Sequence, residues 1–184
     1  MEENLSKKIY LEKVLNECEK GNVIYQETLY KDFYSYTLSI CRLYTYSDGD
    51  AVSILNDSFL KVFSSIKKKK YNKTIPFKNW LRRITINTAI DSYRKNSKHF
   101  HQIEIDAAVQ IPGQDDIIDK LTANDIIDLL DQLPELHRIV FNLYEIQGYN
   151  HKEISEKLNI SKSTSRVFLT RAKKKLRILV FKNF

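Results

Sequence analysis

The sequence predicts an all-α protein built from two small helical domains that are joined by a flexible acidic linker. Glycine and proline are scarce, with 4 and 3 residues among 184. Runs of alternating polarity are also rare, whereas apolar residues recur at helical spacing. The composition is 42% hydrophobic, which is enough for packed cores. A chain of this length forms one ordinary domain or two small ones, and its uneven charge favours two.

Four helices are expected in the first half of the chain. The first spans residues 8–19 and ends near Gly21. The second carries an apolar stripe at helical spacing, made of Leu29, Phe33, Tyr36, Ile40 and Leu43. Gly49 then breaks the pattern, and Asp50 is a candidate N-cap for the third helix, DAVSILNDSFLKVFSSI. A basic loop, KKKKYNKTIP, leads through Pro76 to a fourth helix that begins FKNWLRR.

Residues 98–123 separate this first domain, residues 1–97, from a second domain at residues 124–184. The separating segment loses helical periodicity and contains a Pro-Gly pair. It belongs to a strongly acidic stretch that runs from Glu104 to Asp131. We therefore expect a flexible acidic linker between the domains.

The segment GYNHKEISEKLNISKSTSRVFLTRAKKKLR predicts a helix-turn-helix. Asn150 can cap a short helix with Glu153 as its reciprocal partner, and Asn159 suits the left-handed residue of a tight turn. Ser161 then caps a second helix. The side of that helix turned away from its apolar residues is polar or basic and includes Lys162, Ser163, Thr164, Arg166, Thr170, Arg171 and Lys174. Such a helix fits the major groove of DNA, where arginine pairs with guanine and smaller polar residues hold phosphates.

The charge pattern points to a polyanion as the partner. The formal net charge is +7, and the isoelectric point is about 9.2. Lys67 to Lys98 is densely basic with Asp91 as its one acid, and Ser161 to Phe184 contains no acid. Two basic blocks separated by an acidic one suggest two contacts on one nucleic acid, through a connector that avoids it.

Several other classes of protein are disfavoured. Cys18 and Cys41 belong to no CxxC motif or Cys/His cluster, so we expect reduced thiols, no metal site and no cofactor. The sequence has no nucleophile motif and no phosphate-binding loop, so we expect no enzyme. The N-terminus MEENLSKKIYLEKV is charged, and no apolar run reaches the roughly 18 residues of a membrane span. We expect a cytoplasmic protein without membrane insertion.

Two blocks of the chain resemble bacterial RNA polymerase sigma factors of the extracytoplasmic-function (ECF) group. DAVSILNDSFLKVF stands where that family has a DAEDLVQETFLRAW-like helix, and FKNWLRRITINTAIDSYRK where it has FxxWLxxIAxNxxxDxxRK. LDQLPELHRIVFNLYEIQGYNHKEISEKLNIS and the helix after it resemble sigma region 4, as residues 24–97 resemble region 2. The resemblance implies a protein that binds core polymerase, directs it to promoters and helps to melt the DNA.

The resemblance also implies a partner for each surface. The family's core-binding positions match Asp50, Ser53, Asn56 and Asp57, which would meet the clamp coiled coil of the largest polymerase subunit. Region 2 would capture unpaired bases of the −10 element with Lys68, Tyr71, Lys73, Phe77, Arg83, Asn87 and Arg94. Tyr71 and Phe77 are the expected stacking surfaces, whereas Trp80 is expected to pack the helix against its neighbours. Region 4 would read the −35 element as duplex and meet the flap of the second largest subunit. An anti-sigma factor is a further implied partner.

Three residues of the second domain depart from the family pattern. Ser163 replaces a usual glycine, Ser165 a usual valine and Phe168 a usual arginine. We expect Ser165 to weaken the packing beneath the second helix of the helix-turn-helix and Phe168 to remove a phosphate contact. The alternative function is a two-module helix-turn-helix regulator that acts without core polymerase. That alternative leaves the basic block at 67–98 unexplained.

Overall fold

The computed structural model describes residues 2–96 and 123–183, and every regular element within these ranges is a helix. This confirms the predicted all-α class. The chain divides into two compact units, Met1–Arg42 with Ser47–Ala89 and Leu43–Tyr46 with Ile90–Phe184. The predicted acidic linker at 98–123 lies outside the described residues except for its last position. None of the described helices is long and apolar enough to cross a membrane.

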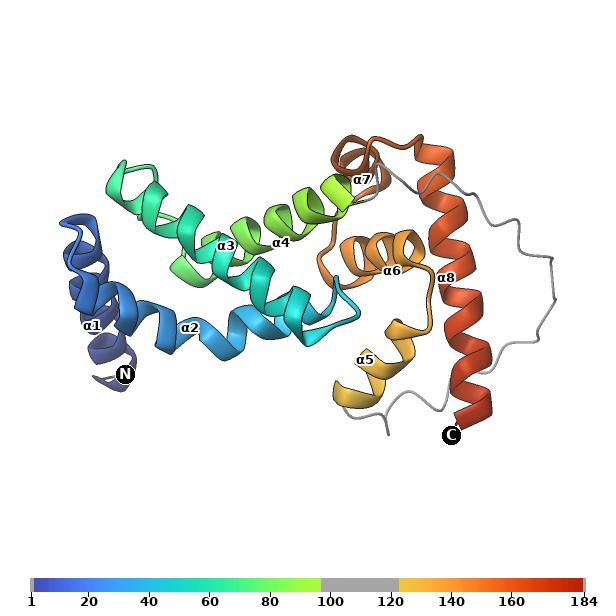
Figure 1. The fold of residues 1–184 in the computed structure, drawn as a ribbon, viewed down its shortest axis with the longest axis horizontal. Coiled ribbons are helices and arrows are strands. Elements are labelled where there is room, and N and C mark those ends of the chain that lie inside the picture. Colours follow the sequence, from blue (N-terminus) through green and yellow to red (C-terminus); the bar gives the residue numbers. More distant parts are fainter. Residues whose placement is uncertain (1, 97–122, 184) are drawn as a thin grey trace. The chain divides into compact units, whose positions relative to one another are not determined.

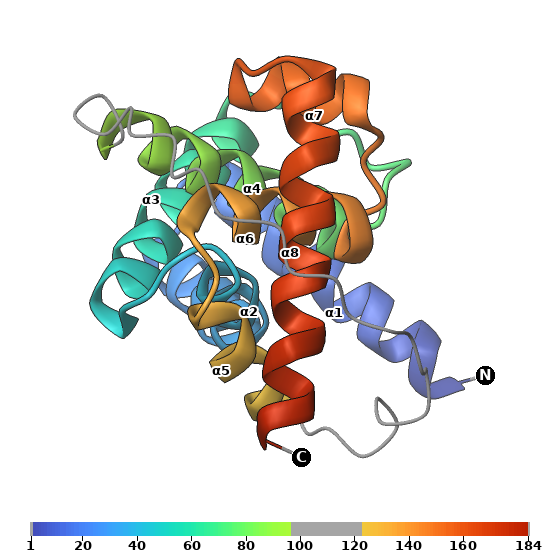
Figure 2. The same cartoon turned by 90° about the vertical axis from the view of Figure 1, so that its right-hand side faces the viewer.

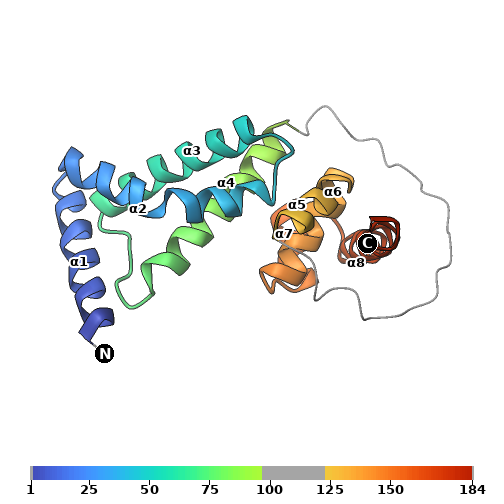
Figure 3. The same cartoon turned by 90° about the horizontal axis from the view of Figure 1, so that it is seen from below.

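The first helices of the chain are α1 (Glu2–Glu19), α2 (Val23–Arg42), α3 (Asp48–Lys67) and α4 (Phe77–Asn96). α1 is longer than the predicted helix at 8–19 because it begins near the N-terminus. It ends before Gly21, whose φ of 83° is a conformation that glycine adopts without strain. α1 packs against α2 and α3 and runs crosswise to both (Figure 3).

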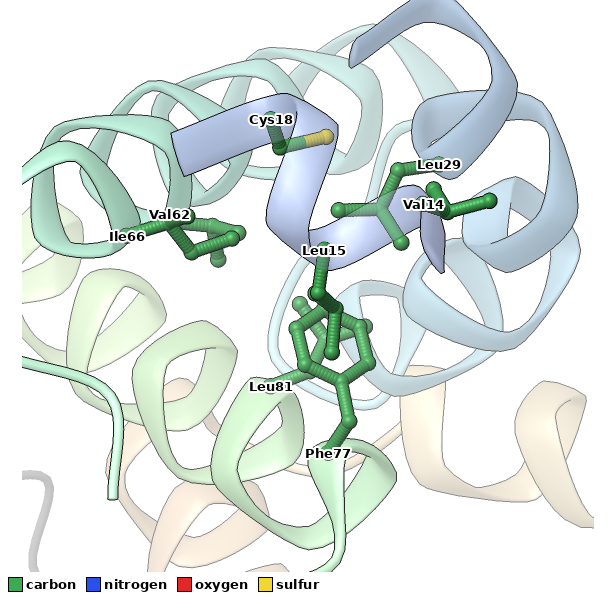
Figure 4. Close-up of a cluster of buried hydrophobic side chains, with 8 residues drawn as sticks. All are labelled: Val14, Leu15, Cys18, Leu29, Val62, Ile66, Phe77 and Leu81. Carbon is green, nitrogen blue, oxygen red and sulfur yellow. The ribbon is translucent and has the colours of Figure 1, made fainter. Parts of the chain in front are cut away.

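A core of apolar side chains holds these four helices together (Figure 4). Each helix contributes at least one buried residue, and the cluster consists of Val14, Leu15, Cys18, Leu29, Val62, Ile66, Phe77 and Leu81. One face of α3 is buried in this core, since Leu55, Phe59 and Val62 are all buried. Burial of this face fixes which side of α3 remains open to solvent.

The start of α3 differs from the prediction. Ser47, not Asp50, is the N-cap, and its hydroxyl oxygen accepts a hydrogen bond from the Asp50 amide at 3.1 Å. The Ser47 hydroxyl also donates to the Asp50 carboxylate at 2.8 Å. Serine and aspartate three residues apart can therefore satisfy each other, and the helix gains one more turn than a cap at Asp50 would give.

The second half of the chain folds into α5 (Ala123–Asp131), α6 (Glu135–Phe141), the π-helical turn η3 (Asn142–Ile146), α7 (His151–Leu158) and α8 (Lys162–Asn183). α8 packs against α5, α6 and α7. α7 lies beside the N-terminal end of α8 and α5 beside its C-terminal half (Figures 1 and 2). Leu169 and Ala172 of α8 are buried in these contacts.

Candidate nucleic-acid interface

The basic loop between α3 and α4 is a folded turn that is tied to α1. Lys69 adopts a left-handed conformation with φ of 54°, and its ammonium group lies 3.2 Å from the Glu19 carboxylate. The Lys73 ammonium donates to the Asn16 side-chain oxygen at 3.1 Å. Asn72 accepts from the amide of Thr74 at 2.9 Å. α1 therefore positions the loop, a role that sequence reasoning missed.

The aromatic residues of the loop correct the predicted stacking surfaces. Phe77 is the first residue of α4, and it is 3% exposed because its ring packs into the core against Phe33 at 5.0 Å between centroids. It therefore offers no open face to a base in this conformation. Tyr71 is half-buried, packs on Trp80 at 4.7 Å between centroids, and donates its hydroxyl to the Ile75 carbonyl. Burial of its ring raises the pKa of the Tyr71 hydroxyl.

Trp80 packs against the same core cluster and contacts Phe77 as well as Tyr71. This arrangement agrees with a packing role for the single tryptophan. The rings of Tyr71, Phe77 and Trp80 contact one another and connect the loop to the core. The loop lysines, in contrast, are exposed to solvent. Aromatic residues and lysines of one basic stretch thus occupy two different environments.

A groove of about 780 Å³ runs between α1 and this loop. Its lining combines rings and aliphatic side chains with lysines from both sides, including Lys7 and Lys8 of α1 and Lys73 and Lys78 beyond the loop's turn. Glu12 of α1 also lines the groove, but the lysines outnumber it, so the groove is basic. Neither helical spacing nor a motif in the sequence predicts that Lys7 and Lys8 lie beside the loop.

The outer stripe of α4 continues this basic surface. Arg83 and Arg94 are exposed and Asn87 is half-buried, so the predicted spacing does bring them to one side of the helix. Arg94 also lies 3.8 Å from the Asp91 carboxylate one turn earlier. Lys68 and Lys73 are exposed in the preceding loop.

A polar face of α3 is open to solvent. Asp50, Ser53, Asn56 and Asp57 are all exposed. The Asn56 side-chain oxygen accepts a hydrogen bond from the Tyr30 hydroxyl at 2.9 Å, which fixes its orientation. Leu60 lies one turn after Asp57 and is 67% exposed. Its place at helical spacing from Asn56 and Asp57 could have identified it as part of this face.

The predicted helix-turn-helix is present with its predicted caps. The Asn150 side chain accepts from the amides of Lys152 and Glu153, and the Glu153 carboxylate accepts from the Asn150 amide, so the capping box is complete. Asn159 has φ of 54°, the left-handed residue of the turn. The Ser161 hydroxyl oxygen accepts from the Thr164 amide at 2.9 Å at the start of α8.

The family departures Ser165 and Phe168 both face the interior of this unit. Ser165 is fully buried, and its hydroxyl lies 3.0 Å from Nδ1 of His151 on α7. We expected Ser165 to weaken the packing beneath α8. Instead, its hydroxyl makes a polar contact between α7 and α8 at this position. Phe168 is half-buried, with its ring 4.9 Å from the ring of His137 on α6.

His151 is held on two sides. Its ring stacks on Tyr144 at 4.7 Å between centroids, and Nδ1 faces Ser165. Burial lowers the pKa of His151, and the nearby Arg166 guanidinium lowers it further. The imidazole is therefore neutral at physiological pH and acts as a packing group with one hydrogen bond.

The residues predicted to read DNA from α8 are open to solvent, fully or in part. Lys162, Ser163, Arg166 and Thr170 are exposed, and Thr164, Arg171 and Lys174 are half-buried. Val167 lies among them and is 44% exposed. Sequence reasoning omitted Val167 because it considered only polar residues, although its spacing places it on the same side. Within the described residues, no group of three or more His, Cys, Asp or Glu side chains could hold a metal ion.

Comparison with known proteins decides the family. A model of sigma-70 region 2 matches residues 29–99, and a model of sigma-70 region 4 matches residues 123–176. The chain belongs to the sigma-70 family of RNA polymerase sigma factors, in the ECF group. Region 2 therefore comprises the polar face of α3, the basic loop and α4. Region 4 comprises α5 to α8 and contains the helix-turn-helix.

Curated relatives support the same group. RNA polymerase sigma factor SigZ of Bacillus subtilis is 33% identical over 131 residues, which are 70% of this chain and 73% of SigZ. ECF RNA polymerase sigma factor SigM of the same organism is 29% identical over 163 residues, 85% of this chain and 92% of SigM. Sigma factor RpoE of Bartonella quintana, solved in complex with the anti-sigma factor NepR, has a similar fold. Its TM-score is 0.51 at 16% identity, over 86% of this chain and 98% of that one.

Proposed function

We propose that this protein is an ECF sigma factor that directs core RNA polymerase to specific promoters and helps to open the DNA there. The observation that carries the proposal is the presence of regions 2 and 4 in one chain, in the family's order. The protein then acts in the cytoplasm on promoter DNA, without bond chemistry of its own. A regulator that works without core polymerase would have no use for region 2.

Region 2 supplies the contact with core polymerase in this proposal. Asp50 and Asp57 place negative charge on an exposed face of α3, and Ser53 and Asn56 add polar groups between them. Leu60 adds an apolar contact one turn further on. A surface of this kind suits the clamp coiled coil of the largest subunit, since it combines solvated polar groups with one apolar anchor at its end.

The basic loop and α4 receive the unpaired −10 strand in this proposal. Lys68, Lys73, Arg83 and Arg94 neutralise phosphates, and Asn87 offers hydrogen bonds to a base edge. Tyr71 is the loop ring nearest to solvent, since it lines the groove beside α1 and is only half-buried. We therefore assign base stacking to Tyr71 and a supporting role to Phe77.

Region 4 reads the −35 element as duplex in this proposal. The outer face of α8 enters the major groove, where Arg166 and Arg171 pair with base edges while the hydroxyl residues and lysines hold the backbone. Contact with the flap of the second largest subunit, and control by an anti-sigma factor, follow from membership of the family.

Binding to core polymerase is the decisive experiment. The purified chain should co-migrate with core polymerase and support initiation from specific promoters in vitro. Asp57→Lys should reduce this binding, whereas Glu27→Lys makes the same charge change on the exposed side of α2 and should leave it intact. A chain that binds duplex DNA but never binds core polymerase would favour the regulator instead.

The separate duties of the two regions can be tested with the same holoenzyme. Arg166→Ala and Arg171→Ala should weaken binding to duplex that carries the −35 element. They should leave binding to an unpaired −10 strand unchanged. Equal loss of both activities would contradict the division of labour between the regions.

A further inference from the structure

One apolar side chain lies within the DNA-reading surface of α8. Val167 is 44% exposed, four residues after Ser163 and three before Thr170. At about 100° per residue, these three residues and Lys174 share one side of the helix. Arg166 is its exposed neighbour on the same side. Val167 therefore occupies the middle of the surface that region 4 presents to duplex DNA.

The hydroxyl groups beside Val167 are engaged within the protein. The Ser163 hydroxyl lies 2.6 Å from the Ser161 hydroxyl at the start of α8. The Thr170 hydroxyl donates to the Arg166 carbonyl at 3.0 Å. The Thr170 proton is thus used within α8, and the Ser163 oxygen is held beside the N-cap. Between them, Val167 presents two methyl groups.

Val167 lies outside the buried core of the described part of this unit. The buried side of α8 is formed by other residues, including Ser165, Leu169 and Ala172. Branching at Cβ makes valine a poorer helix former than most polar residues that suit an exposed site. Its presence at the centre of the face is therefore best explained by what the face contacts.

We propose that Val167 contacts the C5 methyl group of a thymine in the major groove and so sets the preference of region 4 for thymine at one position of its −35 element. Thymine is the one base with a methyl group in that groove, and apolar side chains recognise it. The inference rests on the proposed function, because it requires α8 to enter the groove. It deepens that function by assigning a base preference to one residue.

A selection experiment identifies the position that Val167 reads. The holoenzyme, formed from the full chain and core polymerase, selects from duplexes with a randomised −35 element. The wild type should enrich thymine at one position, on one strand. Val167→Ser should lose the thymine preference there and keep the preferences at the other positions. Because Val167 is exposed, the substitution should leave the thermal unfolding midpoint unchanged.

Replacing thymine by deoxyuridine then tests the methyl contact directly. Loss of one buried methyl group should weaken wild-type binding about fourfold at that position. Val167→Ser should bind the thymine and uracil duplexes equally. Ile126→Ser changes another exposed β-branched residue, on α5, and should keep the wild-type discrimination.

The outcomes separate the two proposals. If the wild-type holoenzyme selects no −35 duplex, the proposed function is wrong and this inference falls with it. If it selects a clear element but no thymine-to-uracil change weakens binding, the function stands and the role of Val167 is wrong. Retention of the full methyl effect by Val167→Ser would also overturn the assignment.

Discussion

Asn150→Ala should destabilise the second unit by about 1 kcal/mol, within the range of roughly 0.5–2 kcal/mol for loss of an N-cap. The Asn150 side-chain oxygen accepts from the Lys152 amide at 2.9 Å and from the Glu153 amide at 3.0 Å. Alanine removes both bonds. The return bond from the Asn150 amide to the Glu153 carboxylate, at 2.8 Å, survives because it uses the backbone. Water can reach the two amides, which keeps the cost near the middle of the range.

The measurement is thermal unfolding of the full chain together with hydrogen exchange at the start of α7. A loss of about 1 kcal/mol lowers the midpoint of a domain of this size by about 4–8 °C. The amides of Lys152 and Glu153 should exchange faster. Asn150→Asp is the matched control, since aspartate keeps the acceptor oxygen and places negative charge at the positive end of the helix. An unchanged midpoint in the alanine variant, or equal losses in both variants, would refute the reasoning.

Three further predictions concern buried groups. Phe77→Ala should lower the free energy of unfolding of the first unit by about 3–5 kcal/mol in urea titration, because it empties a core position; a loss below about 1 kcal/mol would mean that the ring is not packed in solution. Burial raises the pKa of Cys18 to about 11 and of Cys41 to about 12, so neither thiol should react with Ellman's reagent at pH 8 until the protein is denatured. The lowered pKa of His151 means that the unfolded chain binds the proton more tightly, so stability from this group is present above about pH 6.5 and is lost as the pH falls through the folded pKa. The urea midpoint of the second unit should therefore drop between pH 7.5 and pH 5 by more in the wild type than in His151→Asn, and identical drops would contradict it.

Local signals in the sequence predicted most helices because capping residues and apolar spacing act over a few residues. Asn150 and Asn159 lie where a cap and a left-handed turn are needed, and the structure has both. The start of α3 was misplaced because Ser47 and Asp50 are both good caps. Only the hydrogen bonds between them decide which one begins the helix.

The candidate site was predictable where it depends on one helix and unpredictable where it depends on several. Exposure of Asp57 on α3 and Arg166 on α8 follows from helical spacing against a buried face. Burial of Phe77 does not, since it depends on Phe33 of another helix. The ion pair between Glu19 of α1 and Lys69 of the basic loop likewise joins residues that are distant in the sequence.

The residues of α8 that depart from the family pattern, Ser165 and Phe168, contact other helices of region 4. Ser165 and Phe168 each meet a histidine on a different helix, His151 and His137, so both substitutions are accommodated by partners that sequence spacing cannot reveal. Phe168 points toward α6, so the outer face of α8 loses one arginine of the family pattern without gaining a ring. In the proposed function, base reading then falls to fewer cationic side chains, with Val167 beside them. A surface that mixes guanidinium groups with methyl groups distinguishes guanine from thymine by different chemistry, so we expect the −35 preference of this protein to combine both kinds of contact.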